Sequence, residues 1–166
     1  MRLERLLCSW FGAGWLKPAP GTWGSAAALP IGWLLWDLGG HPALAGAMAI
    51  VFFVGWWASE RIVRHARSER ASKGFVGEAD GGLEDPSWVV IDEVAGQWMT
   101  LLFTPPSLLG YAIGFALFRL FDIWKPWPVS WADQKLKGGL GIMLDDILAG
   151  LMGLAVMTLL QRFVLP

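Results

Sequence analysis

Five carboxylates lie beside or within strongly apolar stretches of this chain. They form three groups: Asp92 with Glu93, Asp122 alone, and Asp145 with Asp146. A carboxylate near hydrocarbon is costly unless it pairs with a cation, reaches water or binds a metal ion. The three groups therefore indicate a functional site, and separate helices must bring them together.

Mg²⁺ is the metal ion that such a set of carboxylates would bind best. Mg²⁺ prefers hard oxygen ligands, and it accepts few from the protein while keeping waters and substrate phosphate oxygens in its shell. We therefore expect a Mg²⁺ site built from Asp92, Glu93, Asp122, Asp145 and Asp146. Zinc fits less well, because His41 is assigned to the opposite side of the membrane and His65 stands alone in a basic loop; both are expected to be surface or structural residues.

A structural ion network is the alternative role for these acids. They could pair with Arg119, Lys125 and neighbouring backbone donors. Adjacent acids make this alternative weaker, because two like charges need more compensation than the nearby bases provide.

Residues 17–25, KPAPGTWGS, could handle an anion. Proline and glycine set a tight turn, hydroxyl side chains follow, and a helix is expected to begin at once. Its free backbone N–H groups and dipole can receive a phosphate, so Lys17, Thr22 and Ser25 are candidate phosphate-binding residues. The alternative is an ordinary helix cap in which Thr22 or Ser25 only satisfies unpaired N–H donors.

Residues 119–128, RLFDIWKPWP, present a second group of charges. At helical spacing Arg119 and Asp122, and with them Lys125, share one face, and Pro126 then stops the helix. A guanidinium, a carboxylate and an ammonium are thus held together at a helix end. Arg119 and Lys125 are candidate phosphate ligands, with a structural ion network again as the alternative.

Composition places the chain among membrane proteins. Its 166 residues are 55% hydrophobic, include twelve Trp, and are only 16% charged, against about 25% in soluble proteins. The formal net charge is −1, and we expect no nucleic-acid partner. The single cysteine, Cys8, excludes a disulfide framework and is expected to be a buried neutral thiol. The amphipathic residues 1–14 carry Glu4 and no cleavage site, so they predict an interfacial helix.

Five apolar segments follow, at about 25–38, 42–59, 88–103, 108–121 and 142–165. Gly and Pro punctuate them, and we expect loops at 18–21, 39–40, 104–106 and 138–139. A simple span needs ~20 apolar residues, so the first, third and fourth segments are short. The predicted fold is therefore an all-α integral membrane protein of one domain, 1–166: a compact bundle of four to five transmembrane or half-spanning helices plus the N-terminal interfacial helix.

Basic residues predict the orientation of this bundle. With five spans, one side receives nearly all of them: Arg2, Arg5, Lys17, Arg61, Arg64, Arg67, Arg70, Lys73, Lys125, Lys135 and Lys137. The opposite loops, 39–41 and 104–107, hold no Lys or Arg, so the basic side is expected to be cytoplasmic. The same alternation places all three acidic groups at the cytoplasmic ends of their helices. Residues 61–86 are expected to be a helix end followed by a flexible loop, and Trp124, Trp127 and Trp131 an interfacial aromatic belt.

The motifs together resemble the bacterial phosphatidylglycerophosphatase A family. The resemblance rests on PGTWGS at 20–25, Asp92-Glu93 followed by Gly96 and Trp98, RLFDIWKPWP at 119–128 and GGLGIMLDDILAG at 138–150. It covers residues 12–150, with four motifs in the family's order. It implies a Mg²⁺-dependent enzyme of the bacterial inner membrane that removes the terminal phosphate of phosphatidylglycerophosphate to give phosphatidylglycerol.

The resemblance agrees with a cytoplasmic layer of charged groups at headgroup level. The five acids would hold one or two Mg²⁺ ions, and Lys17, Thr22, Ser25, Arg119 and Lys125 would neutralise phosphate charge. One carboxylate, such as Asp146, could instead act as base or nucleophile. Two other functions stay open: a metal-dependent phosphotransferase acting on lipid headgroups, and a non-enzymatic ion transporter. Metal count, oligomeric state and acyl-chain preference are not encoded in any motif of the chain.

Overall fold

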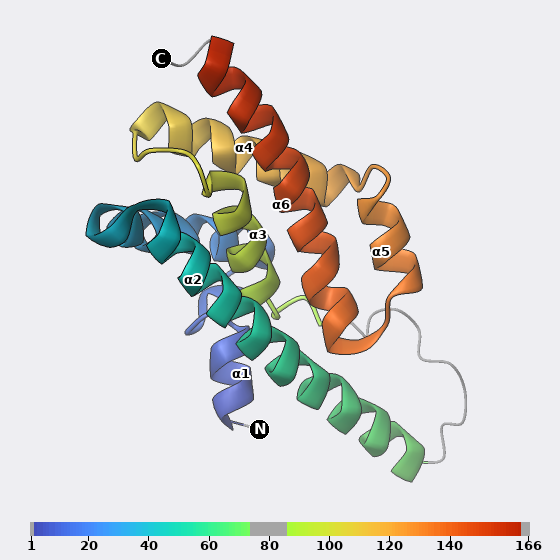
Figure 1. The fold of residues 1–166 in the computed structure, drawn as a ribbon. Coiled ribbons are helices and arrows are strands. Elements are labelled where there is room, and N and C mark those ends of the chain that lie inside the picture. Colours follow the sequence, from blue (N-terminus) through green and yellow to red (C-terminus); the bar gives the residue numbers. More distant parts are fainter. Residues whose placement is uncertain (1, 74–85, 164–166) are drawn as a thin grey trace.

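The computed structural model describes residues 2–73 and 86–163, and this part of the chain is all helical. The elements, labelled in Figure 1, are α1 (Arg2–Cys8), a 3₁₀ turn η1 (Ala13–Trp15), α2 (Pro20–Ser72), α3 (Ile91–Leu101), α4 (Leu108–Trp124), α5 (Val129–Lys135) and α6 (Gly138–Phe163). The prediction of an all-α chain is confirmed for the described residues.

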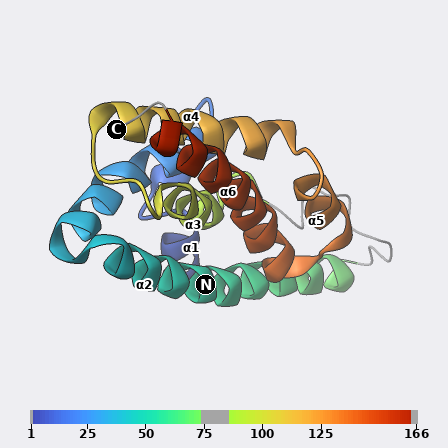
Figure 2. The same cartoon turned by 45° about the horizontal axis from the view of Figure 1, so that its top comes forward.

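Helix α2 is two helical limbs joined by a glycine kink. Gly39 (φ −161°, ψ 18°) and Gly40 (φ 63°, ψ −158°) leave helical geometry, and the positive φ of Gly40 is one that glycine adopts without strain. The predicted break at 39–40 is confirmed, and Figure 2 shows the two limbs diverging from it. The second limb continues to Ser72, which confirms the predicted helix end; residues 74–85 of the predicted flexible loop lie outside the described residues.

Two of the expected loops are helical in part or in full: the loop at 18–21 is helical only at its last two residues, and 138–139 is helical throughout. Pro20 and Gly21 form the first turn of α2, where a proline fits because the first N–H groups of a helix need no intrahelical partner. Gly138 and Gly139 open α6 instead of preceding it. Gly138 has φ +74°, and a Cβ on Gly139 would lie 2.6 Å from the Trp56 carbonyl oxygen, so two glycines let α6 start directly against α2.

Helix α3 occupies the centre of the bundle. Its side chains at Ile91, Val94, Trp98 and Leu101 are almost fully buried, and Trp98 Nε1 donates a hydrogen bond to the Ala28 carbonyl of α2 at 2.9 Å. Figure 2 shows α3 nearly end-on, with α2, α4 and α6 around it. Its 11 residues span about 17 Å, so the third apolar segment is a short helix inside the bundle.

The outer surface of the bundle is apolar over much of its area. The exposed large hydrophobic side chains include Leu34, Leu38, Ile50 and Phe53 on α2, Leu108, Leu109, Leu120 and Ile123 on α4, and Leu151 and Leu159 on α6. Within the described residues, α2 and α6 are the helices long and apolar enough to cross a membrane.

The structure confirms part of what was predicted for residues 1–14. Helix α1 exposes Leu3 and Leu6 and buries Cys8 together with Glu4, whose carboxylate accepts a hydrogen bond from Arg61 Nη1 at 3.1 Å. Burial raises the pKa of the Cys8 thiol to about 11, so the prediction of a buried neutral thiol is confirmed. An interfacial position for α1 stays a prediction.

Candidate functional site

A cavity of about 270 Å³ lies where the N-terminal ends of α2, α3 and α6 meet the C-terminal end of α4. All five acids singled out from the sequence line it, together with two cations. Its lining residues are Ala19, Pro20, Gly21, Ser87, Val89, Asp92, Glu93, Arg119, Asp122, Lys125, Asp145 and Asp146. Residues more than a hundred positions apart in the chain thus meet in one pocket.

Three of the acids form a tight group. Asp92, Glu93 and Asp146 each offer one carboxylate oxygen, and these oxygens all lie within 4.8 Å of one another. Glu93 Oε2 and Asp146 Oδ2 are buried and have no hydrogen-bond partner within the described residues. Like charges this close repel strongly in a buried site, and hard oxygen donors are what a divalent cation recruits. The donor set therefore fits Mg²⁺.

A close helix crossing holds this group together. Gly96 follows Asp92 by one turn of α3, and Gly150 follows Asp146 by one turn of α6. A Cβ on Gly96 would lie 2.5 Å from the carbonyl oxygen of Asp146, and Thr100 Oγ1 lies 3.2 Å from the carbonyl oxygens of both Gly96 and Gly150. The absence of side chains at the crossing lets the two backbones meet directly beneath the acids.

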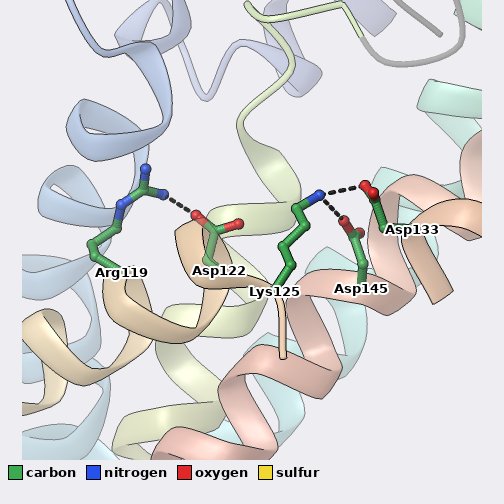
Figure 3. A network of polar contacts seen from close by, with 5 residues as sticks. All are labelled: Arg119, Asp122, Lys125, Asp133 and Asp145. Atoms are coloured by element: carbon green, nitrogen blue, oxygen red, sulfur yellow. Dashed lines mark hydrogen bonds and ion pairs between the residues drawn. The ribbon is translucent and has the colours of Figure 1, made fainter. Parts of the chain in front are cut away.

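The other two acids are paired with cations, as Figure 3 shows. Arg119 Nη1 donates to Asp122 Oδ2 at 2.5 Å. Lys125 Nζ donates to Asp145 Oδ2 at 3.0 Å and also to Asp133 Oδ1. Asp122 and Asp145 therefore position cations in this structure; because each carboxylate has a second oxygen, a further role as metal ligand stays a prediction.

The Lys125 ammonium is held charged by its neighbours. Burial of the side chain by itself would lower the pKa, but the carboxylates of Asp145 and Asp133 outweigh it and raise the pKa above its usual range. A permanently positive group at the rim of an acidic pocket is suited to an anionic ligand such as a phosphate.

The first turn of α2 closes one side of the pocket. A Cβ on Gly21 would collide with Glu93 Oε1 and lie 3.2 Å from Arg119 Nη1, so glycine lets both charged groups approach the helix N-terminus. Ala19, the residue preceding the helix, makes no side-chain cap, and the N–H groups of the first turn have no intrahelical acceptor.

Three predicted phosphate-binding residues are not brought to the pocket. Lys17 is exposed, and neither Lys17 nor Thr22 is among the lining residues. Ser25 is fully buried, and its hydroxyl donates to the Gly21 carbonyl at 2.8 Å. That contact neither caps the helix nor reaches the cavity. A phosphate-binding role for these three residues stays a prediction.

Sequence reasoning missed two residues at the site. Ser87 lines the pocket, and Asp133 on α5 holds Lys125 from outside it. Helix α5 has seven residues, too few to show a helical period, so nothing in the sequence indicated that Asp133 folds back towards Lys125. His41 and His65 are both exposed, as expected, and so are Trp124, Trp127 and Trp131.

The fold and the pocket together define a class of protein: an all-helical chain with clustered carboxylates beside an arginine and a lysine, groups suited to metal-assisted phosphate chemistry. Residues 6–161 match the family described as phosphatidylglycerophosphatase A. The chain belongs to this family of phosphatases, which confirms the resemblance seen in its motifs.

Relatives in several bacteria are similar over most of the chain. Phosphatidylglycerophosphatase A of Escherichia coli K12 is 34% identical over 92% of this chain and 80% of its own length. Phosphatidylglycerophosphatase A of Haemophilus influenzae is 35% identical over 96% and 90%. A Bacteroides thetaiotaomicron protein with the provisional name phosphatidylinositol-3-phosphatase is 36% identical over 89% and 87%. No solved structure matches the chain.

Proposed function

We propose that this protein is a Mg²⁺-dependent phosphatidylglycerophosphatase, which hydrolyses the terminal phosphomonoester of phosphatidylglycerophosphate to phosphatidylglycerol and phosphate. The single observation that supports the Mg²⁺ dependence is the group of Asp92, Glu93 and Asp146, whose carboxylate oxygens lie within 4.8 Å of one another. The substrate is the one named for the family and for its relatives in Escherichia coli and Haemophilus influenzae.

The charged residues of the pocket would have three different roles in the reaction: metal binding, phosphate binding and positioning of the phosphate-binding groups. Asp92, Glu93 and Asp146 would hold Mg²⁺, which polarises phosphoryl oxygens and lowers the pKa of an attacking water when bound. Arg119 and Lys125 neutralise the phosphate charge. Their pairing partners, Asp122 and Asp145, orient the guanidinium and the ammonium towards the cavity that these residues all line.

The surface and the charge of the bundle support a membrane position for the site. The apolar side chains exposed on α2, α4 and α6 suit contact with lipid, and the substrate is itself a lipid. The basic end of α2, with Arg61, Arg64, Arg67 and Arg70, lies at the same end of the bundle as the start of α6 (Figure 1). By the positive-inside rule this end faces the cytoplasm, so the pocket would open to the cytoplasmic leaflet of the inner membrane.

Phosphate release in detergent tests the proposal. Purified protein is given phosphatidylglycerophosphate in mixed micelles with Mg²⁺, with EDTA, and with EDTA followed by excess Mg²⁺. We expect release with Mg²⁺, loss with EDTA and recovery on adding Mg²⁺ back, without any nucleotide. A requirement for a nucleotide donor would favour a phosphotransferase, and no phosphate release under any condition would refute the hydrolase.

Substrate choice needs a second comparison. Phosphatidylinositol 3-phosphate is offered in matched micelles, because a relative of 36% identity carries a name that refers to it. We expect a higher kcat/KM for phosphatidylglycerophosphate. The reverse order would keep the phosphatase chemistry but replace the proposed substrate.

A further inference from the structure

Asp133 holds the Lys125 ammonium from outside the catalytic pocket. Its carboxylate accepts a hydrogen bond from Lys125 Nζ, yet Asp133 is not among the residues that line the cavity. In Figure 3 the ammonium points towards both Asp133 and Asp145, which lie next to each other on the same side of it. Asp145 lines the pocket and Asp133 does not, so the Lys125 ammonium connects an acid of the pocket wall to an acid outside it.

The backbone around Asp133 is well anchored. Val129 and Ala132, on the same short helix α5, are fully buried, and Val129 joins a core cluster with Phe118 of α4 and Ala149 of α6. Lys125 itself ends α4 with a left-handed backbone conformation (φ 47°). Both partners of the contact are therefore held by the main chain, and their approach follows from the fold of residues 125–133.

The number of N–H donors on the Lys125 ammonium allows it to bind both acids and a phosphate at the same time. An ammonium has three N–H donors and no acceptor. Asp133 and Asp145 take two of them, which leaves the third for a phosphate oxygen. With Asp145 as its sole partner, Lys125 would be drawn towards the acidic group of Asp92, Glu93 and Asp146, because opposite charges attract strongly in a partly buried site.

We propose that Asp133 is a positioning residue for the substrate phosphate: it keeps the Lys125 ammonium at the rim of the pocket, where the phosphate enters. This inference rests on the proposed phosphatase function. Asp133 touches neither the reacting atoms nor the metal ligands, so its effect on the reaction passes through Lys125.

Steady-state kinetics of Asp133→Asn and Asp133→Ser, with the full-length protein in detergent and phosphatidylglycerophosphate as substrate, test the proposal. We expect KM to rise roughly threefold to tenfold while kcat stays within about twofold, because a contact that only positions a binding group contributes equally to ground and transition states. Asp133→Glu, which keeps a carboxylate, should restore KM to within about twofold of wild type. Glu69→Gln, an exposed acid paired with His65, is the matched control and should change neither constant.

A double-mutant cycle separates positioning from general structure. In a Lys125→Met background, Asp133→Asn should raise KM no further, because the group it positions is gone. An unchanged KM in both Asp133 variants, or an equal rise with and without Lys125, would overturn the inference. Absence of phosphate release by the wild-type protein would instead refute the proposed function, so the two failures are distinguishable. Asp133→Ser keeps the test open if Asp133→Asn does not give folded protein by gel filtration.

Discussion

Glu60 of α2 accepts a hydrogen bond through Oε2 from the backbone N–H of Gly139, in the first turn of α6, at 2.9 Å. Its other oxygen, Oε1, accepts from Arg64 Nε at 2.7 Å. An acidic side chain at this position satisfies one of the unpaired N–H groups of α6 and favours the positive end of the helix dipole. The contact ties the starting position of α6, and with it Asp145 and Asp146, to the long helix α2.

Loss of this cap is expected to destabilise the protein. Glu60→Ala should lower the free energy of unfolding by about 1 kcal/mol, the usual effect of removing a helix cap. Thermal unfolding in detergent measures it. Glu60→Gln keeps an acceptor oxygen and should lose less, so equal losses in the two variants would contradict the capping role.

Removing one charge from the group of Asp92, Glu93 and Asp146 is expected to have opposite effects on stability and on activity. Asp146→Asn removes one of three mutually repelling charges, so without divalent ions we expect the variant to be at least as stable as wild type, yet to release no phosphate. Mg²⁺ at about 100 times its dissociation constant should stabilise the wild type by about 2.7 kcal/mol and leave the variant nearly unchanged.

Thermal unfolding with and without Mg²⁺, beside phosphate release, checks both effects. Glu69→Gln, an exposed acid on α2, is the charge-matched control and should respond to Mg²⁺ like wild type. If Mg²⁺ did not change the thermal unfolding of the wild-type protein, the proposed metal site would be refuted.

The glycine crossing of α3 and α6 predicts a steric effect on the site. Gly96→Ala places a Cβ 2.5 Å from both the Asp146 carbonyl oxygen and Phe118 Cε2, so the helices must separate, at a cost of about 1–3 kcal/mol. Phosphate release should fall as well, because the same shift moves Asp92 and Glu93 away from Asp146.

Gly46→Ala is the control for that substitution. A Cβ at Gly46 of α2 meets nothing within 4 Å, and alanine favours a helix by up to about 1 kcal/mol over glycine. We expect unchanged activity and equal or higher stability. If Gly96→Ala behaved like Gly46→Ala in both assays, the close crossing would not be what positions the acids.

Cysteine labelling tests the orientation of the bundle. Cys8 is buried with a pKa of about 11, so it should not react with a membrane-impermeant maleimide at neutral pH. Ser68→Cys, exposed near the basic end of α2, should be labelled in inverted vesicles but not in intact spheroplasts. Pro105→Cys, in the exposed loop between α3 and α4, should show the reverse pattern. Labelling of both variants from the same side would refute the proposed topology.

Local sequence rules predicted most of the helix breaks and helix ends. The break at Gly39 and Gly40, the loop at 104–106 and the end of α4 before Pro126 follow from glycine and proline, whose backbone preferences act over a few residues. They failed at residues 138–139, because two glycines there serve a close approach to α2 that depends on another helix.

The sequence alone determined that the chain is helical and apolar, and that five acids, an arginine and a lysine have the types and spacing for phosphate and metal chemistry. Only the tertiary structure decided how those charges are shared: Asp92, Glu93 and Asp146 form one group, while Asp122 and Asp145 each hold a cation. It also decided that Asp133 reaches Lys125, whereas Lys17, Thr22 and Ser25 do not reach the pocket. The physical reason is that electrostatic partners are chosen by distance in space, and in this fold a close glycine crossing and the return of α5 set those distances.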